Sequence, residues 1–230
     1  MFKLEMHLHV AETSPCAQTD EKTIAGIYSE AGYDGIVYTS HYNSFLSEYY
    51  FSGDVKKYNE NFLSHFETLK AECAKRGVKV FFGMEAMPDM TSYYEETPDK
   101  AEFLIYGVTP DFMRHSPERI FKMTVEELHD FCKKNGWILS QAHPFRPMIS
   151  YHHPEFLDAA EVINDNPRQQ NNNDLAIKYA KENNLIQTAG AAGRARGRTF
   201  EERGKLGKGT RFRTEKTRPR AFCVLIPFVC

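Results

Sequence analysis

The sequence lacks several features that would place the protein in a membrane or outside the cell. None of its apolar runs approaches the roughly 18 residues that a membrane-spanning helix needs. No basic segment followed by an apolar run opens the chain, so no secretory signal is expected. Five cysteines are scattered without CxxC spacing, which argues against a disulfide framework and a thiolate zinc site. We therefore expect a cytoplasmic protein with no membrane partner.

Composition is otherwise ordinary, but the charge is divided along the chain. With 230 residues, 41% hydrophobic and 26% charged, the sequence suits one large α/β domain or two small ones. Residues 1–193 hold 18 Lys and Arg against 28 Asp and Glu, whereas residues 194–230 hold 11 against 3. The basic end shows no helical or strand period, which predicts a disordered tail over 191–230. A basic arm that binds nucleic acid is the alternative reading of this segment.

Short apolar segments alternate with amphipathic ones over residues 1–190. Strands are expected at 2–8, 35–40, 78–86, 101–108, 137–143, 159–164 and 184–190. Helices are expected at 20–33, with Asp20 as N-cap, at 55–77, at 124–136, with a Thr124–Glu127 capping box, and at 172–183. Nearly all-apolar strands that alternate with helices indicate parallel pairing in a barrel or a doubly wound sheet.

Histidines and one glutamate fall where the expected strands end. His7 and His9 close the first strand on a shared face, and His41 follows the second. Glu85 ends the third strand and His143 ends the fifth. Active sites of parallel α/β folds are built at the carboxyl ends of their strands, and imidazole is the commonest metal ligand. The pattern therefore predicts a site for zinc, manganese or iron.

The ordered segments "EMHLH", "GIVYTSHYN", "FFGMEA" and "QAHPFRP" resemble the motifs of the PHP (polymerase and histidinol phosphatase) superfamily. The resemblance runs over about residues 3–190. It implies an α/β fold, a distorted TIM-like (β/α)7 barrel, that holds two or three divalent metal ions and hydrolyses phosphoesters. The expected substrate is a small phosphorylated metabolite or nucleotide.

The resemblance also assigns roles to residues. His7 and His9 would bind the first metal, Glu85 would bridge two metals, and His41 and His143 would bind the second and third. A further His or Asp is expected about six residues after His9, where Glu12 is the available substitute. Apart from the resemblance, Arg146 lies three residues past His143, where its planar guanidinium is expected to clamp the phosphate; a surface arginine is the alternative.

Three positions depart from the family pattern. Ser40 stands where the family has Asp before the second-strand histidine, and Thr109 stands where a histidine often follows the fourth strand. After the last strand the family continues Gly-Ser-Asp-x-His, but this chain reads "AAGRARGR", and no Asp or His occurs after Asp174. The barrel is thus expected to be incomplete at its C-terminus, with a reduced third metal site.

The genetic code offers an account of the tail. If residues 193–196 were encoded GGA-CGC-GCA-CGA, reading one nucleotide later would give Asp-Ala-His. We therefore interpret 191–230 as an out-of-frame tail and 1–190 as the PHP-type hydrolase domain. Three functions follow: a metal-dependent phosphoesterase, a catalytically impaired metal-binding remnant, and a basic-tailed nucleic-acid binder, of which composition favours the last least.

Overall fold

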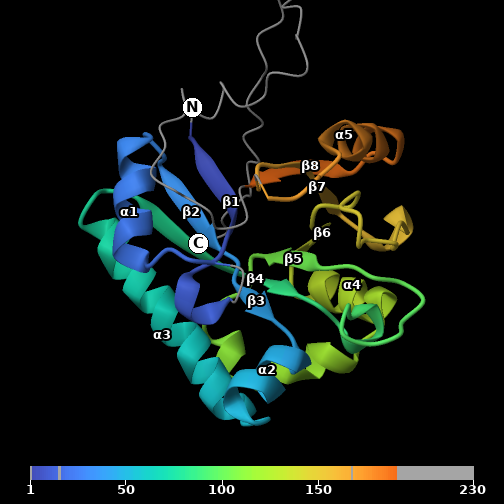
Figure 1. The fold of residues 1–230 in the computed structure, drawn as a ribbon, viewed down its shortest axis with the longest axis horizontal. Coiled ribbons are helices and arrows are strands. Elements are labelled where there is room, and N and C mark those ends of the chain that lie inside the picture. The colour runs from blue at the N-terminus through green and yellow to red at the C-terminus, as the bar shows by residue number, and fades with distance from the viewer. Residues whose placement is uncertain (1, 15–16, 167, 191–230) are drawn as a thin grey trace, which may run out of the picture.

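A computed structural model describes residues 2–14, 17–166 and 168–190, whose strands form a nearly closed barrel (Figure 1). The predictions for 191–230 concern residues outside this described part. Around the sheet the strand order is β1-β2-β4-β5-β6-β7-β8, and the short β3 pairs with β4. The strands are β1 Leu4–Leu8, β2 Gly35–Tyr38, β3 His41–Tyr42, β4 Lys79–Ala86, β5 Phe103–Tyr106, β6 Ile138–Gln141, β7 Ala159–Asn164 and β8 Ile186–Gly190.

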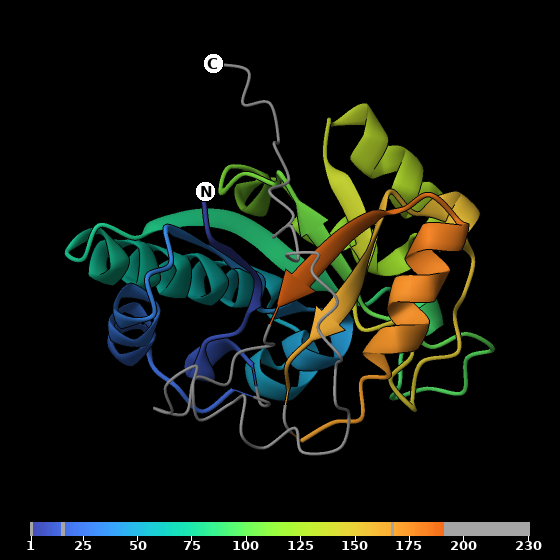
Figure 2. The same ribbon diagram turned by 90° about the horizontal axis from the view of Figure 1, so that it is seen from above.

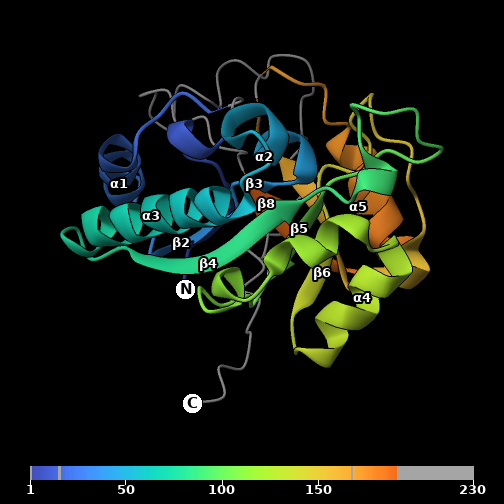
Figure 3. The same cartoon turned by 90° about the horizontal axis from the view of Figure 1, so that it is seen from below.

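Helices cover the outside of this sheet. They are α1 Glu21–Glu30, α2 Ser44–Phe51, α3 Val55–Ala74, α4 Val125–Lys134 and α5 Asn173–Glu182. α1 and α3 lie together beside β1, β2 and β4, while α5 lies along β7 and β8 (Figures 2 and 3). No helix in the described ranges is both long and apolar enough to cross a membrane.

Local signals in the sequence explain where the helices begin. The Asp20 side chain accepts a hydrogen bond from the Thr23 amide, as predicted for the start of α1. Thr124 and Glu127 form the expected capping box of α4. Each such cap contributes about 1 kcal/mol to helix stability because it satisfies amides that the helix itself leaves unpaired.

β5 departs from the expected parallel arrangement, because it runs antiparallel to both β4 and β6. No crossover helix separates β4 from β5, so the chain turns back along the sheet instead of returning to its starting edge. Glu102, just before β5, therefore lies at the edge where β4 ends, and Thr109 lies beyond the opposite edge, exposed to solvent. Thr109 is thus remote from the edge at which Glu85 lies, and the reduced third metal site stays a prediction.

Buried tyrosines hold the second strand and the loop that follows it. Tyr38, Tyr42 and Tyr58 pack with Phe62 in the core under α3. Each hydroxyl is satisfied: that of Tyr38 donates to the Phe62 carbonyl, and that of Tyr58 donates to the carbonyl of His41 at 2.8 Å. Burial of these rings therefore also fixes the backbone that carries His41.

The last strand closes against the first at Gly190. A Cβ atom at this position would lie 2.3 Å from the Cβ of His7 and 2.8 Å from its amide nitrogen. No real Cβ tolerates such distances, so glycine is what lets β8 approach β1 at the level of His7.

We expect Gly190→Ala to lower the free energy of unfolding by about 1–3 kcal/mol, because the added methyl group overpacks the junction of β1 and β8. Gly26→Ala is the matched control. Gly26 lies within α1 with open space around its Cβ position, so that change should be neutral or stabilising. Urea unfolding of both variants measures the difference, and equal effects would contradict the close approach.

Candidate metal centre

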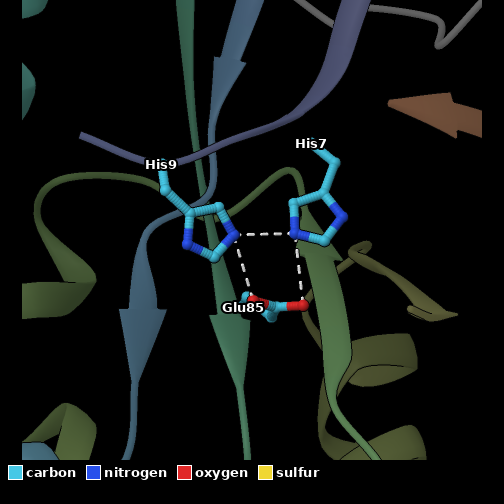
Figure 4. A group of neighbouring side chains, drawn as sticks. All are labelled: His7, His9 and Glu85. Atoms are coloured by element: carbon cyan, nitrogen blue, oxygen red, sulfur yellow. Dashed lines mark hydrogen bonds and ion pairs between the residues drawn. The ribbon is translucent and has the colours of Figure 1, made fainter. Parts of the chain in front are cut away.

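The four strand-end histidines and Glu85 converge at one end of the barrel. The Nε2 atoms of His7 and His9 lie 2.8 Å apart. They also lie 3.2 Å and 3.1 Å from the two carboxylate oxygens of Glu85 (Figure 4). These three donor groups come close enough together to hold a metal ion.

A second group of donors adjoins the first through Glu85. The Nδ1 atom of His41 lies 2.8 Å from Glu85 Oε2 and 3.1 Å from Glu102 Oε1. His41, Glu85 and Glu102 form the second set that could hold a metal ion. The Nε2 atom of His143 lies 3.3 Å from Glu85 and 3.5 Å from Glu102. Glu85 is thus shared by both groups of donors.

The strands explain why these side chains meet. Residues 7 and 9 follow the two-residue period of β1, and His41 stands directly opposite Glu85 in the β3–β4 register. His143 follows β6 with a φ of 29°, a conformation that side-chain-bearing residues rarely adopt. Strain of this kind occurs where the surroundings hold a residue in place for its function.

Two further residues orient the histidine rings from behind. Glu161 in β7 lies with Oε1 3.0 Å from Nδ1 of His7. The Ser14 hydroxyl lies 3.1 Å from Nδ1 of His9 and accepts the amide of His41 at 3.2 Å. In both His7 and His9 the outer nitrogen is engaged, and Nε2 is the atom that faces Glu85.

Burial and charge oppose each other in this cluster. Burial disfavours protonation of His7, but the carboxylates of Glu161 and Glu85 outweigh it and raise its pKa well above the usual value. Burial likewise disfavours ionisation of Glu85. The imidazoles of His7, His41 and His9 outweigh that effect, and the pKa of Glu85 lies well below its usual range. Without metal, opposite charges on His7 and Glu85 thus favour each other despite their burial.

The donor set fits a divalent metal. Both carboxylate oxygens of Glu85 are buried and, among the described residues, accept no hydrogen bond of good geometry, although imidazole nitrogens surround them. A buried carboxylate in this state is costly unless a cation compensates it. Imidazole nitrogens mixed with carboxylate oxygens are the ligands of zinc, manganese and iron.

The remaining sequence candidates lie in different places. Glu12 belongs to a short 3-10 helix, Ala11–Thr13, and its side chain is outside the described part, so its role stays a prediction. Ser40, at the position where the PHP motif has Asp, is fully buried and accepts hydrogen bonds from the Val10 amide and the Thr13 hydroxyl. It therefore secures the loop that follows β1.

Arg146 lies near the centre but is not part of the cluster. Its guanidinium donates to the amide oxygens of Asn171, at 3.1 Å and 3.2 Å, and of Asn164, at 3.3 Å. These partners are neutral, so they fix the side chain without cancelling its charge. The amide-rich segment that supplies Asn171 thus holds the arginine in position.

Sequence reasoning missed Glu102, Glu161 and Ser14. Glu161 had a visible signal, because it is the one charged residue in the otherwise apolar strand "AAEVIN". Glu102 precedes its strand, so its place at the centre follows only once β5 is known to be antiparallel. Ser14 reaches the histidines through a loop, for which neither periodicity nor spacing gives a sign.

Comparisons with known proteins support the fold. No protein-family model matches the chain, and no curated protein matches it. A similar solved structure is that of a candidate metal-dependent phosphoesterase from Bifidobacterium adolescentis, at 12% identity and a TM-score of 0.51, covering 89% of this chain and 95% of that one. Another is an amidohydrolase from Chromobacterium violaceum with bound sulfate and no metal, at 11% identity and a TM-score of 0.54, covering 84% and 88%.

At this level of identity the likeness concerns the fold. Both matches span most of each chain. The α/β, TIM-like barrel predicted from the motifs is therefore confirmed for the described residues.

In the metal-free protein we expect stability to fall as the pH rises above about 6.5. The pKa of His7 is raised in the folded chain, so its stabilising contribution is complete below the unfolded pKa and is lost as pH passes the folded value. Urea unfolding in chelator over about pH 6–9 measures this dependence. A His7→Asn variant should show a flatter profile, and identical profiles would contradict the assignment.

Proposed function

We propose that the protein is a metal-dependent phosphoesterase of the PHP type that acts on a small phosphorylated metabolite or nucleotide. The observation that supports this most directly is the buried carboxylate of Glu85 between imidazoles from three other strand ends or loops. A cluster of this composition has no evident structural use, because burying so many titratable groups opposes folding.

Two or three divalent ions, manganese, zinc or iron, are the cofactors that fit the centre. His7, His9 and Glu85 would hold one ion, and His41, Glu85 and Glu102 another. His143, close to both carboxylates, would serve a third or complete one of the two. Divalent ions at such a centre offset the negative charge of a phosphate and lower the pKa of a coordinated water.

Arg146 supplies the charge that recognises the substrate. The bonds to Asn171 and Asn164 use Nε and Nη2, so the Nη1 group is the part of the guanidinium that would donate to a phosphate. The amidohydrolase of similar fold binds sulfate, an anion with the same tetrahedral arrangement of oxygens. An oxyanion in this chain would be held between Arg146 and the metal centre.

A cavity of about 310 Å³ next to the cluster supports a small substrate. Ser14, which contacts His9 and His41, lines it together with the aromatic side chains of Tyr50 and Tyr58. Its volume lies near the lower end of those that bind small molecules, about 300–1,000 Å³. A group of metabolite size would fit in this cavity, which adjoins the cluster through Ser14.

Hydrolysis of p-nitrophenyl phosphate by protein loaded with manganese, zinc or iron tests the proposal. Glu85→Gln should lower both metal content and kcat/KM by about 100-fold or more, since it removes a ligand shared by both donor groups. Glu21→Gln is the matched control, because Glu21 is also buried and paired with a histidine, His65, but lies between α1 and α3. No metal-dependent turnover, or equal losses in both variants, would contradict the proposal.

The second candidate function is a metal-binding remnant that turns over slowly or not at all. The observation that favours it is the absence of any Asp or His after Asp174, where the family places its last two ligands. Restoring the reading frame to Asp-x-His after Gly190 separates the two functions. A large gain in turnover would favour the remnant, and equal turnover would favour the active enzyme as it stands.

For the substrate clamp, we expect Arg146→Ala to raise KM for p-nitrophenyl phosphate about tenfold while metal content stays constant. Arg146→Lys should recover little of the loss, because an ammonium group lacks the planar set of donors that contacts Asn171, Asn164 and a phosphate together. Metal analysis alongside the kinetics is the control. A changed metal content with unchanged KM would assign Arg146 to the metal centre instead.

A further inference from the structure

We propose that Glu161 and Asn164 are positioning residues that join the metal centre to the phosphate clamp. Glu161 would orient the ring of His7 for metal binding. Asn164, which donates to Glu161, would in turn orient the side chain of Arg146. The role of Glu161 in metal binding, the metal half of this inference, concerns only the donor cluster. The role of Asn164 in phosphate binding, the phosphate half, rests on the proposed function.

The contact between Glu161 and His7 determines which ring nitrogen carries the proton. The Oε1 atom of Glu161 lies 3.0 Å from Nδ1 of His7, and both side chains are at most 1% exposed. A carboxylate offers only acceptors, so Nδ1 must hold the hydrogen. The neutral ring then presents the lone pair of Nε2 to the space it shares with His9 and Glu85, where a metal would bind.

The second oxygen of Glu161 holds a different strand. Oε2 accepts the backbone amide of His143 at 2.9 Å and the side-chain amide of Asn164 at 3.0 Å. His143 is the residue with the strained φ of 29°, so this bond helps to keep its backbone in an unfavourable conformation. One carboxylate therefore fixes two of the four histidines.

Asn164 links Glu161 to Arg146. Because its amide group donates to Glu161, its carbonyl oxygen must face the other way, where it accepts from Arg146 at 3.3 Å and from the Asn166 amide at 3.1 Å. Glu161 thus orients Asn164, and Asn164 orients Arg146. Residues three apart in a regular strand face opposite sides, but the register of β7 shifts between Glu161 and Ile163, and both Glu161 and Asn164 are buried.

A glutamine cannot replace Glu161, although it has the same shape. Three donors converge on the carboxylate: His7 Nδ1, the His143 amide and the Asn164 side chain. In one orientation the glutamine NH2 group would face the two amides; in the other it would face His7 and force the hydrogen onto Nε2. The first orientation opposes two donors, and the second removes the metal-binding lone pair of His7.

The test compares Glu161→Gln with Glu161→Asp in full-length protein, by calorimetric titration with Mn²⁺. A role limited to filling space predicts that isosteric glutamine is the milder change. Our proposal predicts the reverse, with affinity lowered about 10–100-fold by glutamine and partly retained by aspartate, which keeps both acceptors. Glu21→Gln, the change at the remote Glu21–His65 pair, should alter Mn²⁺ affinity less than threefold. Glutamine equal to wild type, or milder than aspartate, would overturn the metal half.

Asn164→Ala tests the connection to Arg146. We expect Mn²⁺ affinity within about threefold of wild type, and inorganic phosphate binding to the Mn²⁺-loaded protein weakened about 5–10-fold. Unchanged phosphate affinity, or an equal loss in both titrations, would overturn this half. Both titrations measure binding, so a wild-type protein that binds Mn²⁺ and phosphate but fails to hydrolyse p-nitrophenyl phosphate would refute the proposed function alone.

Discussion

The buried carboxylate of Glu85 needs a compensating positive charge inside the barrel, and the surrounding imidazoles are placed to supply it. Glu85 is 1% exposed and lies within 3.3 Å of four histidines. A charge in such a place is tolerated only when opposite charge compensates it, either from protonated imidazoles or from a cation. Because the histidines come from β1, β3 and the loop after β6, the compensation exists only when the barrel has formed.

The same constraint explains the tight junction of the first and last strands. His7 can reach Glu85 and Glu161 only if β1 lies between β2 and β8, and Gly190 allows that approach because it has no side chain. The contacts that Glu161 and Ser14 make with the histidines then follow from the contacts that the histidines make with Glu85. His7 and His9 direct Nε2 at the centre, and their Nδ1 atoms contact the side chains of Glu161 and Ser14.

Sequence patterns predicted the parts of the molecule that depend on local rules. Period-two spacing paired His7 with His9, and capping residues marked the starts of α1 and α4. The direction of β5 was not predictable, because an apolar segment reads the same whether it pairs parallel or antiparallel. Glu102 was missed for that reason. α2 was missed because "SFLSEYYF" is rich in aromatic and small polar residues, which favour helix weakly, although Asn43 caps it.

Glu161 shows which contacts the local sequence pattern cannot predict. Glu161 is flanked by apolar residues in a buried strand, which marks it as unusual but does not name its partner. Its contacts with His7 and His143 span 154 and 18 residues of sequence, so only the closed sheet brings them together. Long-range pairing of this kind is fixed by topology, for which a single sequence holds little information.

Anomalous diffraction from crystals soaked in Mn²⁺ would locate bound ions at the proposed centre. One peak is expected between His7 Nε2, His9 Nε2 and the carboxylate of Glu85, and a second beside His41, Glu85 and Glu102. Peaks that occur only at surface carboxylates, with the imidazoles of His7 and His9 still in contact with each other, would contradict the proposed centre.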